Sequence, residues 1–294
     1  MKSAALLCLS LFIGTAAFAQ TEKIALWSGP APGTENRDNT EQVETSGNIV
    51  RVHQPELTYF PAPNQSVSAP ALLVCPGGGY RNVVMPKEGT RVAEFFQKHG
   101  FAVFVLKYRL HPNDAVQDAR RAIRVIRKQA DKFHIDPQKI GVVGFSAGGH
   151  LSANLAVSYA TADIADETDK ISARPDFCAP IYGVFEALRR ADFAPGRIND
   201  AVFEIPAIKD SLTDKTPPMF LAHAVDDKTV PVEHSLNLFI ALKAKGIPVE
   251  LHLYEKSGHG FALDPKRGYA SSWGEAFLLW LKAHGIEPAA ATTP

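Results

Sequence analysis

The chain has 294 residues, of which 46% are hydrophobic and 21% charged, and its 31 basic side chains balance its 31 acidic ones. This ordinary globular composition supplies enough apolar material for one large α/β domain. No block of like charge predicts binding to nucleic acid or to an anionic membrane surface.

The first residues are typical of a secretory signal peptide. Lys2 gives a positive start, residues 4–13 are apolar, and residues 17–19 read small-x-small, as a cleavage signal does. The apolar stretch is too short to anchor the mature chain in a membrane. We therefore predict a signal peptide over residues 1–19 and export to the periplasm or the cell exterior.

The next segment differs from the remainder of the mature chain. Residues 20–47 are polar and rich in turn-forming residues, which predicts an extended N-terminal arm. Residues 49–60 alternate apolar and polar side chains and predict one or two antiparallel edge strands. We expect the catalytic domain over residues 48–287 and a flexible tail over residues 288–294.

From residue 71 onward, short apolar runs alternate with amphipathic segments. Strands are expected at 71–75, 101–108, 140–143, 177–184, 219–225 and 249–254, and helices at 89–99, 115–133, 147–157, 232–244 and 272–284. This alternation predicts a mostly parallel central sheet with helices on both faces. Arg and Lys are expected on the outer face of the helix at 115–133.

Two segments fall outside this alternation. Residues 161–174 are polar and predict a surface loop, and residues 185–216 have weak periodicity and predict a small cap that shapes the substrate site. Cys75 and Cys178 both lie in apolar runs, where we expect them to pack as small core residues. Whether they form a single disulfide stays open.

Ser146 lies in the sequence Gly-Phe-Ser-Ala-Gly, between an expected buried strand and an expected helix. This context is typical of a nucleophile elbow, because small neighbours permit the tight turn that holds the serine at its tip. The helix that begins at Ala147 directs free N–H groups towards the serine, where an oxyanion would form. The alternative is a strand-to-helix turn that happens to contain a serine.

An aspartate after the strand at 219–225 is expected to orient the catalytic base. Asp226 and Asp227 both stand there. We favour Asp227, because its spacing to Val230-Pro231 matches the turn of hydrolase families. Asp226 fits instead a loop aspartate that caps the following helix, which begins at Val232.

His259 is the expected base, because a serine hydroxyl is a poor nucleophile until a base takes its proton. It follows the last expected strand, and glycines on both sides free the loop to place its ring over Ser146. The chain order Ser146, Asp227, His259 is that of an α/β-hydrolase. His150 is expected to pack or hydrogen-bond beneath the elbow, and His223 to lie on a strand.

The segment Pro-Gly-Gly-Gly-Tyr at 76–80 predicts an oxyanion hole. Bare backbone N–H groups of Gly78 and Gly79, together with that of Ala147, can approach the developing negative charge. Tyr80 is expected to contact the substrate or wall the site. A flexible turn is the alternative, and a phosphate loop would need a Gly-Lys-Ser/Thr ending. No metal ligand set and no cofactor is predicted.

Four segments resemble exported bacterial α/β-hydrolase esterases of the acetyl-xylan-esterase-like group, the xylanase-associated esterases. They are the glycine loop at 76–80, the elbow segment at 135–150, Asp-Asp-Lys-Thr-Val-Pro at 226–231 and Gly-His-Gly-Phe at 258–261. The similarity spans residues 27–285. One departure is the proline at position 76, where related lipases and esterases often carry histidine.

The resemblance implies the α/β-hydrolase fold and a serine esterase that cleaves acetyl esters on plant polysaccharides such as acetylated xylan. The partner would be a small-molecule or polysaccharide ester, with no nucleic acid and no membrane insertion; the oligomeric state stays open. Alternatives are a feruloyl esterase or lipase-like carboxylesterase, a prolyl-oligopeptidase-type peptidase, and a non-catalytic carbohydrate- or partner-binding relative. Such binding relatives tend to lose a member of the triad, which this chain keeps.

Overall fold

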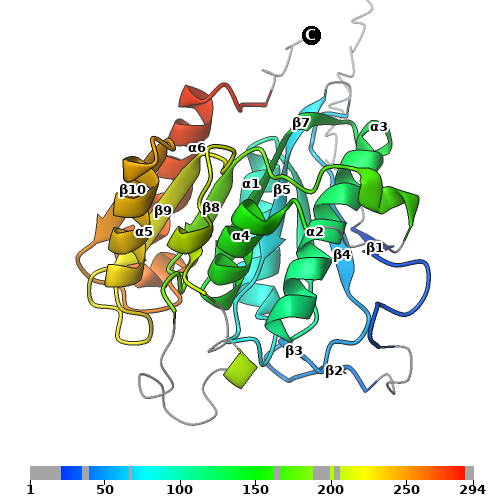
Figure 1. Cartoon of the computed structure of the whole chain (residues 1–294), viewed down its shortest axis with the longest axis horizontal. Coiled ribbons are helices and arrows are strands. Elements are labelled where there is room, and N and C mark those ends of the chain that lie inside the picture. The colour runs from blue at the N-terminus through cyan, green and yellow to red at the C-terminus, as the bar shows by residue number, and fades with distance from the viewer. Residues whose placement is uncertain are drawn as a thin grey trace, which may run out of the picture.

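A central sheet runs through the molecule, and in the described part of the chain it has eight strands (Figure 1). The computed structural model describes residues 21–34, 40–65, 68–161, 166–187, 199–201 and 206–288. In sheet order the strands are β1 (Glu22–Ala25), β4 (Glu56–Phe60), β6 (Ala102–Lys107), β5 (Ala69–Cys75), β7 (Ile135–Phe145), β8 (Cys178–Ile181), β9 (Met219–Ala224) and β10 (Val249–Tyr254). All pairings from β6 to β10 are parallel, as predicted.

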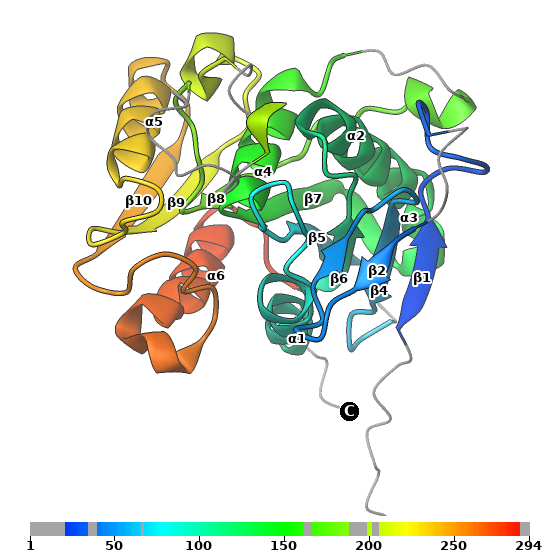
Figure 2. The ribbon, with the colours of Figure 1, turned by 90° about the horizontal axis from the view of Figure 1, so that it is seen from below.

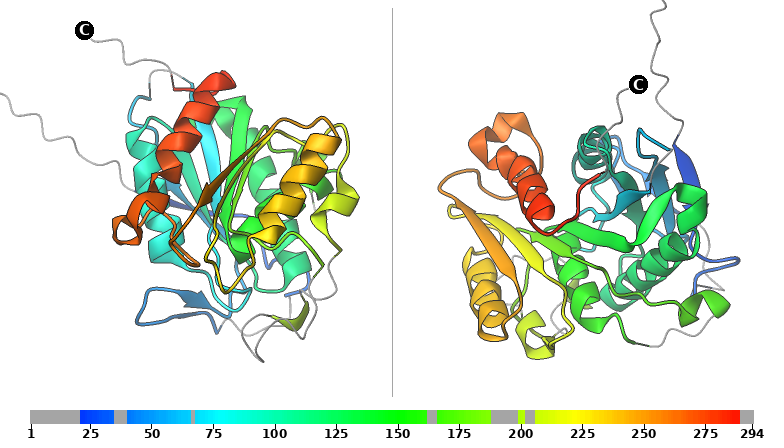
Figure 3. Two further views of the ribbon diagram at one scale, coloured as in Figure 1. Left: turned by 90° about the vertical axis from the view of Figure 1, so that its left-hand side faces the viewer. Right: turned by 90° about the horizontal axis from the view of Figure 1, so that it is seen from above.

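Helices cover both faces of this sheet (Figure 2). The helices are α1 (Arg91–Lys98), α2 (Pro112–Lys128), α3 (Ala130–Phe133), α4 (Ala147–Ser158), α5 (Glu233–Ala244) and α6 (Trp273–Ala283). Helices α1 and α6 lie on one face, and α2, α4 and α5 on the other; Figure 3 shows α5 and α6 on opposite sides of β9 and β10. Because both faces are covered, β5 and β6 are buried at every position, which explains their continuous apolar runs.

The N-terminal region is more structured than predicted. Strand β1, inside the predicted arm, forms the edge of the sheet, so β4 is the second strand from that edge rather than an edge strand. Strands β2 (Gln42–Val43) and β3 (Ile49–Val50) form a separate antiparallel hairpin. Main-chain hydrogen bonds between Ile49 and Val83 join this hairpin to the segment that follows the glycine loop.

The expectation that arginines occupy an outer face of the helix at 115–133 is wrong. Arg121 and Arg124 on α2 are buried, because the 3₁₀ segment Glu167–Lys170 and its flanking residues cover them. Arg121 donates to Asp166 over 2.8 Å, and Arg124 donates to Asp169 over 3.2 Å. Burial becomes tolerable for these charges because each guanidinium is paired. The predicted single helix is also divided, since α2 ends before Gln129 and α3 begins after it.

Several predictions fall on residues outside the described ones. They are the signal peptide at 1–19, residues 188–198 and 202–205 of the predicted cap, and the tail from residue 289. Cys75 and Cys178 are free thiols buried in the core, which confirms that they pack as core residues. Burial raises the pKa of both thiols. Among the helices that the structure describes, none is long and apolar enough to cross a membrane.

Candidate active site

Ser146 stands between the end of β7 and the start of α4 in a strained backbone conformation. Its φ is 52° and its ψ is −115°, a region that non-glycine residues rarely occupy and that costs on the order of 1–3 kcal/mol. Glycines make the turn possible: a Cβ on Gly144 would lie 1.9 Å from the carbonyl oxygen of Gly148, and one on Gly148 would lie 1.9 Å from that of Cys75. The half-buried serine is therefore held at the tip of a turn that only small residues allow.

The imidazole of His259 reaches this serine. Its Nε2 lies 2.8 Å from Ser146 Oγ, and its Nδ1 lies 2.7 Å from Asp227 Oδ2. The ring of Tyr182 meets the imidazole edge-on, with 5.2 Å between ring centroids. The structure thus brings together the three side chains that the sequence placed after separate strands, at the spacing that proton transfer from Ser146 to His259 requires.

Asp227 is buried, and both of its carboxylate oxygens accept hydrogen bonds. Its Oδ1 accepts hydrogen bonds from the N–H groups of Thr229 and Val230, over 2.8 and 3.0 Å. Burial alone would raise the pKa of this carboxyl, but hydrogen bonds from His223 and His259 outweigh it and hold the pKa well below its usual range. Asp227 therefore stays ionised beside His259 at neutral pH and favours the proton on Nδ1, leaving Nε2 to face the serine.

His223 lies on β9, which confirms the expectation that it stands on a strand, but its contacts and the place of Asp226 were not predicted. His223 Nε2 lies 3.3 Å from Asp227 Oδ2, and its Nδ1 lies 2.8 Å from Ser235 Oγ. The alternative expectation, that Asp226 caps α5, is wrong, because no side chain of the described residues caps the N-terminus of this helix. The exposed carboxylate of Asp226 accepts hydrogen bonds from the N–H groups of Ser257 and Gly258, over 2.8 and 2.7 Å. Asp226 thus fixes the loop that carries His259, while Asp227 touches the ring itself.

The glycine loop after β5 turns its backbone against the elbow. Gly78, Gly79 and Tyr80 have φ angles of 130°, 62° and 55°, an unusual left-handed run. A Cβ on Gly77 would lie 3.0 Å from Ser146 Cβ, so the loop packs directly on the serine. Within the described part of the chain, the N–H groups of Gly78 and Gly79 have no hydrogen-bond acceptor. Unpaired N–H groups beside a nucleophile are what an oxyanion hole needs.

Tyr80 points away from open solvent. Its side chain is 1% exposed, and its hydroxyl lies 2.8 Å from His150 Nδ1. The expectation that His150 hydrogen-bonds beneath the elbow is confirmed. Because the Tyr80 hydroxyl is already bonded to His150, the predicted contact with the substrate would have to use another part of Tyr80. Burial lowers the pKa of His150 to about 4, so the ring is neutral near pH 7.

Protonation of His150 is expected to destabilise the fold. Its pKa is about 4 in the folded chain against an ordinary value of 6.5, so the unfolded chain binds the proton first as the pH falls. The free energy of unfolding should therefore decrease between pH 6.5 and pH 4, by on the order of 3 kcal/mol from this residue. Urea unfolding of wild type and His150→Gln across this range isolates the contribution. Parallel pH dependence in the two proteins would contradict it.

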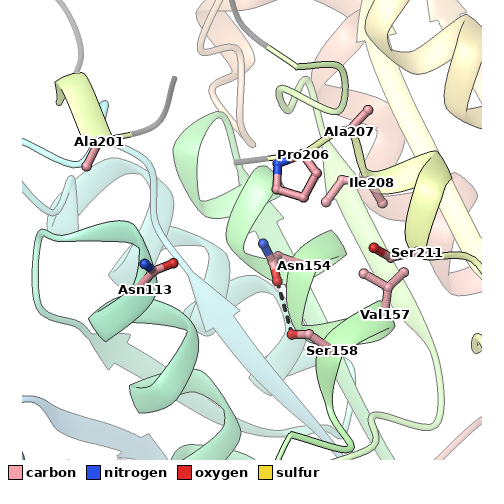
Figure 4. A pocket seen from close by; sticks show the side chains of 9 residues that line it. All are labelled: Asn113, Asn154, Val157, Ser158, Ala201, Pro206, Ala207, Ile208 and Ser211. Carbon is pink, nitrogen blue, oxygen red and sulfur yellow. Dashed lines mark hydrogen bonds between the residues drawn. The ribbon is translucent and has the colours of Figure 1, made fainter. Parts of the chain in front are cut away.

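Two hollows open near these loops. One, of about 520 Å³, lies beside the glycine loop and is lined by Gln42, Val50, Arg51, Tyr80, Arg81, Leu110 and Asn199. The other, of about 310 Å³, opens between α2, α4 and residues 206–211, and Figure 4 shows Asn154, Val157 and Ser158 of α4 beside it. Asn199 donates its backbone N–H to the carbonyl oxygen of Gly79 over 3.0 Å, so the larger hollow, which we call the polar groove, adjoins the glycine loop.

Comparison with protein families gives two matches. Residues 58–187 match the BD-FAE family, and residues 197–284 match the prolyl oligopeptidase family. The chain is 33% identical over 217 residues to endo-1,4-beta-xylanase B of Butyrivibrio fibrisolvens, covering 68% of this chain and 34% of that protein. It is 28% identical to the acetylxylan esterase of Xylanibacter ruminicola, covering 74% of this chain and 46% of that protein. The chain therefore spans less than half the length of these two relatives.

Solved structures extend the comparison over nearly the whole chain. The acetyl ester-xyloside bifunctional hydrolase of Caldicellulosiruptor lactoaceticus is 30% identical, with a TM-score of 0.76, covering 90% of this chain and 97% of that one. A thermophilic esterase of Thermogutta terrifontis is 25% identical, with a TM-score of 0.68, covering 81% of this chain and 90% of that one.

Proposed function

Because the chain belongs to the acetyl-xylan-esterase-like α/β-hydrolases, we propose that it is a serine esterase that releases acetyl groups from xylan or its fragments. The observation that carries the proposal is the hydrogen-bonded series Ser146 Oγ, His259 and Asp227, with distances of 2.8 and 2.7 Å. This arrangement of nucleophile, base and orienting acid is the one that acyl transfer uses.

The reaction proceeds by two acyl transfers. His259 Nε2 takes the hydroxyl proton as Ser146 Oγ bonds to the ester carbonyl carbon, and it returns this proton to the departing alcohol oxygen as the C–O bond breaks. Water then gives a proton to the same nitrogen as its oxygen bonds to the acyl carbon, and His259 returns this proton to Ser146 Oγ as the acyl–serine bond breaks and acetate leaves. Asp227 stays ionised throughout and stabilises the imidazolium that forms twice in the cycle.

Backbone N–H groups stabilise the negative charge on the carbonyl oxygen. The N–H groups of Gly78 and Gly79 are unpaired within the described chain, and that of Ala147 belongs to the first residue of α4. Donors fixed in the backbone need no rearrangement when the oxyanion forms, so their full electrostatic effect falls on the transition state. This supports assigning the three groups to the oxyanion hole.

The alcohol part of the substrate is expected to occupy the polar groove. Arg51 and Arg81 line it, and neither guanidinium has an ion-pair partner in the part of the chain that the structure describes. Donors of this kind suit sugar hydroxyls, and the contact of Asn199 with Gly79 places the groove beside the proposed oxyanion hole.

Substitution in the polar groove should separate polymer binding from ester chemistry. Arg81→Gln and Arg51→Gln are each expected to raise KM for acetylated xylooligosaccharides about 3- to 10-fold, the effect of one lost hydrogen bond. Hydrolysis of 4-nitrophenyl acetate, which has no sugar, should stay within twofold. Lys98→Gln on α1, an exposed change at a residue that does not line the groove, is the control. If each variant impaired hydrolysis of both substrates equally, the sugar would not bind in the polar groove.

The proposed function is tested by hydrolysis of 4-nitrophenyl esters from acetate to octanoate, followed by acetate release from acetylated xylan. A sharp preference for acetate supports the proposal, and a preference for longer chains favours a lipase-like carboxylesterase. Methyl ferulate tests the feruloyl esterase alternative. Cleavage of an acylated amino-acid amide without ester hydrolysis would instead favour a peptidase, consistent with the prolyl oligopeptidase match.

We also propose that the protein is exported. The basis is the sequence of residues 1–19, which lie outside the described part of the structure. Cell fractionation of the producing bacterium distinguishes the periplasm from the culture medium, and the mature protein should begin at residue 20. Recovery of full-length chain in the cytoplasm would contradict the proposal.

A further inference from the structure

A buried carboxyl group, that of Glu88, lies beneath the proposed active site and has no part in the acyl transfer described above. It belongs to the π-helical segment Met85–Thr90, which follows the glycine loop, and it is 5% exposed. Burying a carboxylate is costly unless hydrogen bonds replace its water. The partners of Glu88 therefore indicate why a carboxyl group is kept there.

Each oxygen of Glu88 reaches a different loop of the site. Its Oε2 accepts a hydrogen bond from the N–H of Gly77 over 2.7 Å, at the base of the glycine loop. Its Oε1 accepts from the hydroxyl of Tyr182 over 3.1 Å. That hydroxyl in turn accepts from the N–H of Ala262 over 3.1 Å, three residues beyond His259. One carboxylate thus joins the oxyanion side of the site to the histidine side.

This link between the two loops lies close to Ser146. A Cβ on Gly77 would lie 2.7 Å from Glu88 Oε2 and 3.0 Å from Ser146 Cβ, so Gly77 is packed between the carboxylate and the nucleophile. Tyr182 has a left-handed φ of 38° and turns its ring edge-on to His259. A shift of either loop would change the distance from Ser146 to the oxyanion donors or to the base.

The charge of Glu88 also suits the site. Burial raises the pKa of Glu88, while the N–H of Gly77, the nearby His259 and the Tyr182 hydroxyl favour its ionised form. When His259 gains a proton during acyl transfer, an ionised carboxylate nearby becomes more favourable still. Asp227 remains the group that touches the ring, and Glu88 acts at longer range.

We propose that Glu88 is a positioning residue for acyl transfer, which holds the Gly77–Gly79 loop and the His259 loop at a fixed separation across Ser146. The inference rests on the proposed serine-hydrolase function. Because catalysis is sensitive to displacements of an ångström or less, loss of this link should affect the transition state more than substrate binding.

Three variants test this role. Glu88→Ala removes both acceptors and should lower kcat for 4-nitrophenyl acetate about 10- to 100-fold, with KM changed less than about twofold. Glu88→Gln keeps an oxygen acceptor for Gly77 and should recover part of this loss. Tyr182→Phe keeps the ring but removes the hydroxyl bridge, and its effect should not add to that of Glu88→Ala, because both break the same link. Glu94→Gln on α1, an exposed carboxyl group, is the matched control.

A second readout does not depend on the substrate. The rate at which a fluorophosphonate labels Ser146 requires both an activated hydroxyl and oxyanion donors, and it should fall in parallel with kcat in Glu88→Ala. Wild-type labelling rates and kcat in a folded Glu88→Ala or Glu88→Gln variant, with only the melting temperature changed, would overturn the proposal. A wild-type protein that is labelled but hydrolyses no ester would contradict the proposed substrate, and the labelling rates would still decide the role of Glu88.

Discussion

Replacement of Ser146 by alanine is expected to lower kcat for 4-nitrophenyl acetate by on the order of 10³-fold or more. The hydroxyl is the only atom group removed, and it lies 2.8 Å from His259 Nε2. Without it no acyl-enzyme can form, and any remaining hydrolysis relies on water held beside the oxyanion donors. The measurement is initial-rate kinetics with the variant purified apart from wild-type enzyme, because slight contamination would hide the effect.

The fold of this variant should be unchanged. Alanine is as small as serine and adopts the same strained turn, whose shape is imposed by the glycines at 144 and 148. Matching circular dichroism and a melting temperature close to that of wild type would establish this. Near-full activity in a folded Ser146→Ala protein would show that another residue is the nucleophile and would remove the basis of the proposed mechanism.

The neighbouring aspartates should differ sharply when each is changed to asparagine. Asp227→Asn is expected to lower kcat by on the order of 10⁴-fold, because an amide beside His259 Nδ1 no longer favours the tautomer that accepts the serine proton. Asp226→Asn keeps an oxygen acceptor for the N–H groups of Ser257 and Gly258, so its loss should be tenfold or less. Because both substitutions replace a carboxylate by an amide of the same shape at adjacent positions, each variant is the control for the other.

Initial-rate kinetics of both variants and wild type with 4-nitrophenyl acetate decide between the two aspartates. If Asp226→Asn abolishes activity while Asp227→Asn retains it, the assignment of the orienting acid is wrong.

The sequence predicts the structure correctly where one local signal is enough. The strands of the parallel sheet are buried on both faces, so each is a short apolar run. One example is β5, which ends at the buried Cys75. Ser146, Asp227 and His259 each follow such a run, and parallel strands bring their carboxyl ends to one edge. The sequence alone therefore predicts that these three residues, far apart in the chain, lie close together.

The sequence is misleading where the environment of a side chain depends on a distant partner. Hydrophobic periodicity predicts that the arginines of the helix at 115–133 are exposed, but Arg121 and Arg124 pair with Asp166 and Asp169, each 45 residues later in the chain. Glu88 stands in the polar run Met-Pro-Lys-Glu-Gly, which gives no sign of burial. Its hydrogen bond to Tyr182 spans 94 positions, and only the folded chain reveals it.

The hairpin of β2 and β3 meets the segment after the glycine loop through two main-chain hydrogen bonds between Ile49 and Val83, of 3.0 and 2.8 Å. A main-chain contact keeps its geometry whatever side chains the hairpin carries. The hairpin side chains that line the polar groove, Gln42 and Val50, can therefore change without moving the glycine loop, and under the proposed function the bound sugar would change while Ser146 stays in place. Esterases of this kind that serve different polysaccharides should diverge first at residues 40–53, which makes the hairpin the natural segment to exchange when a new specificity is sought.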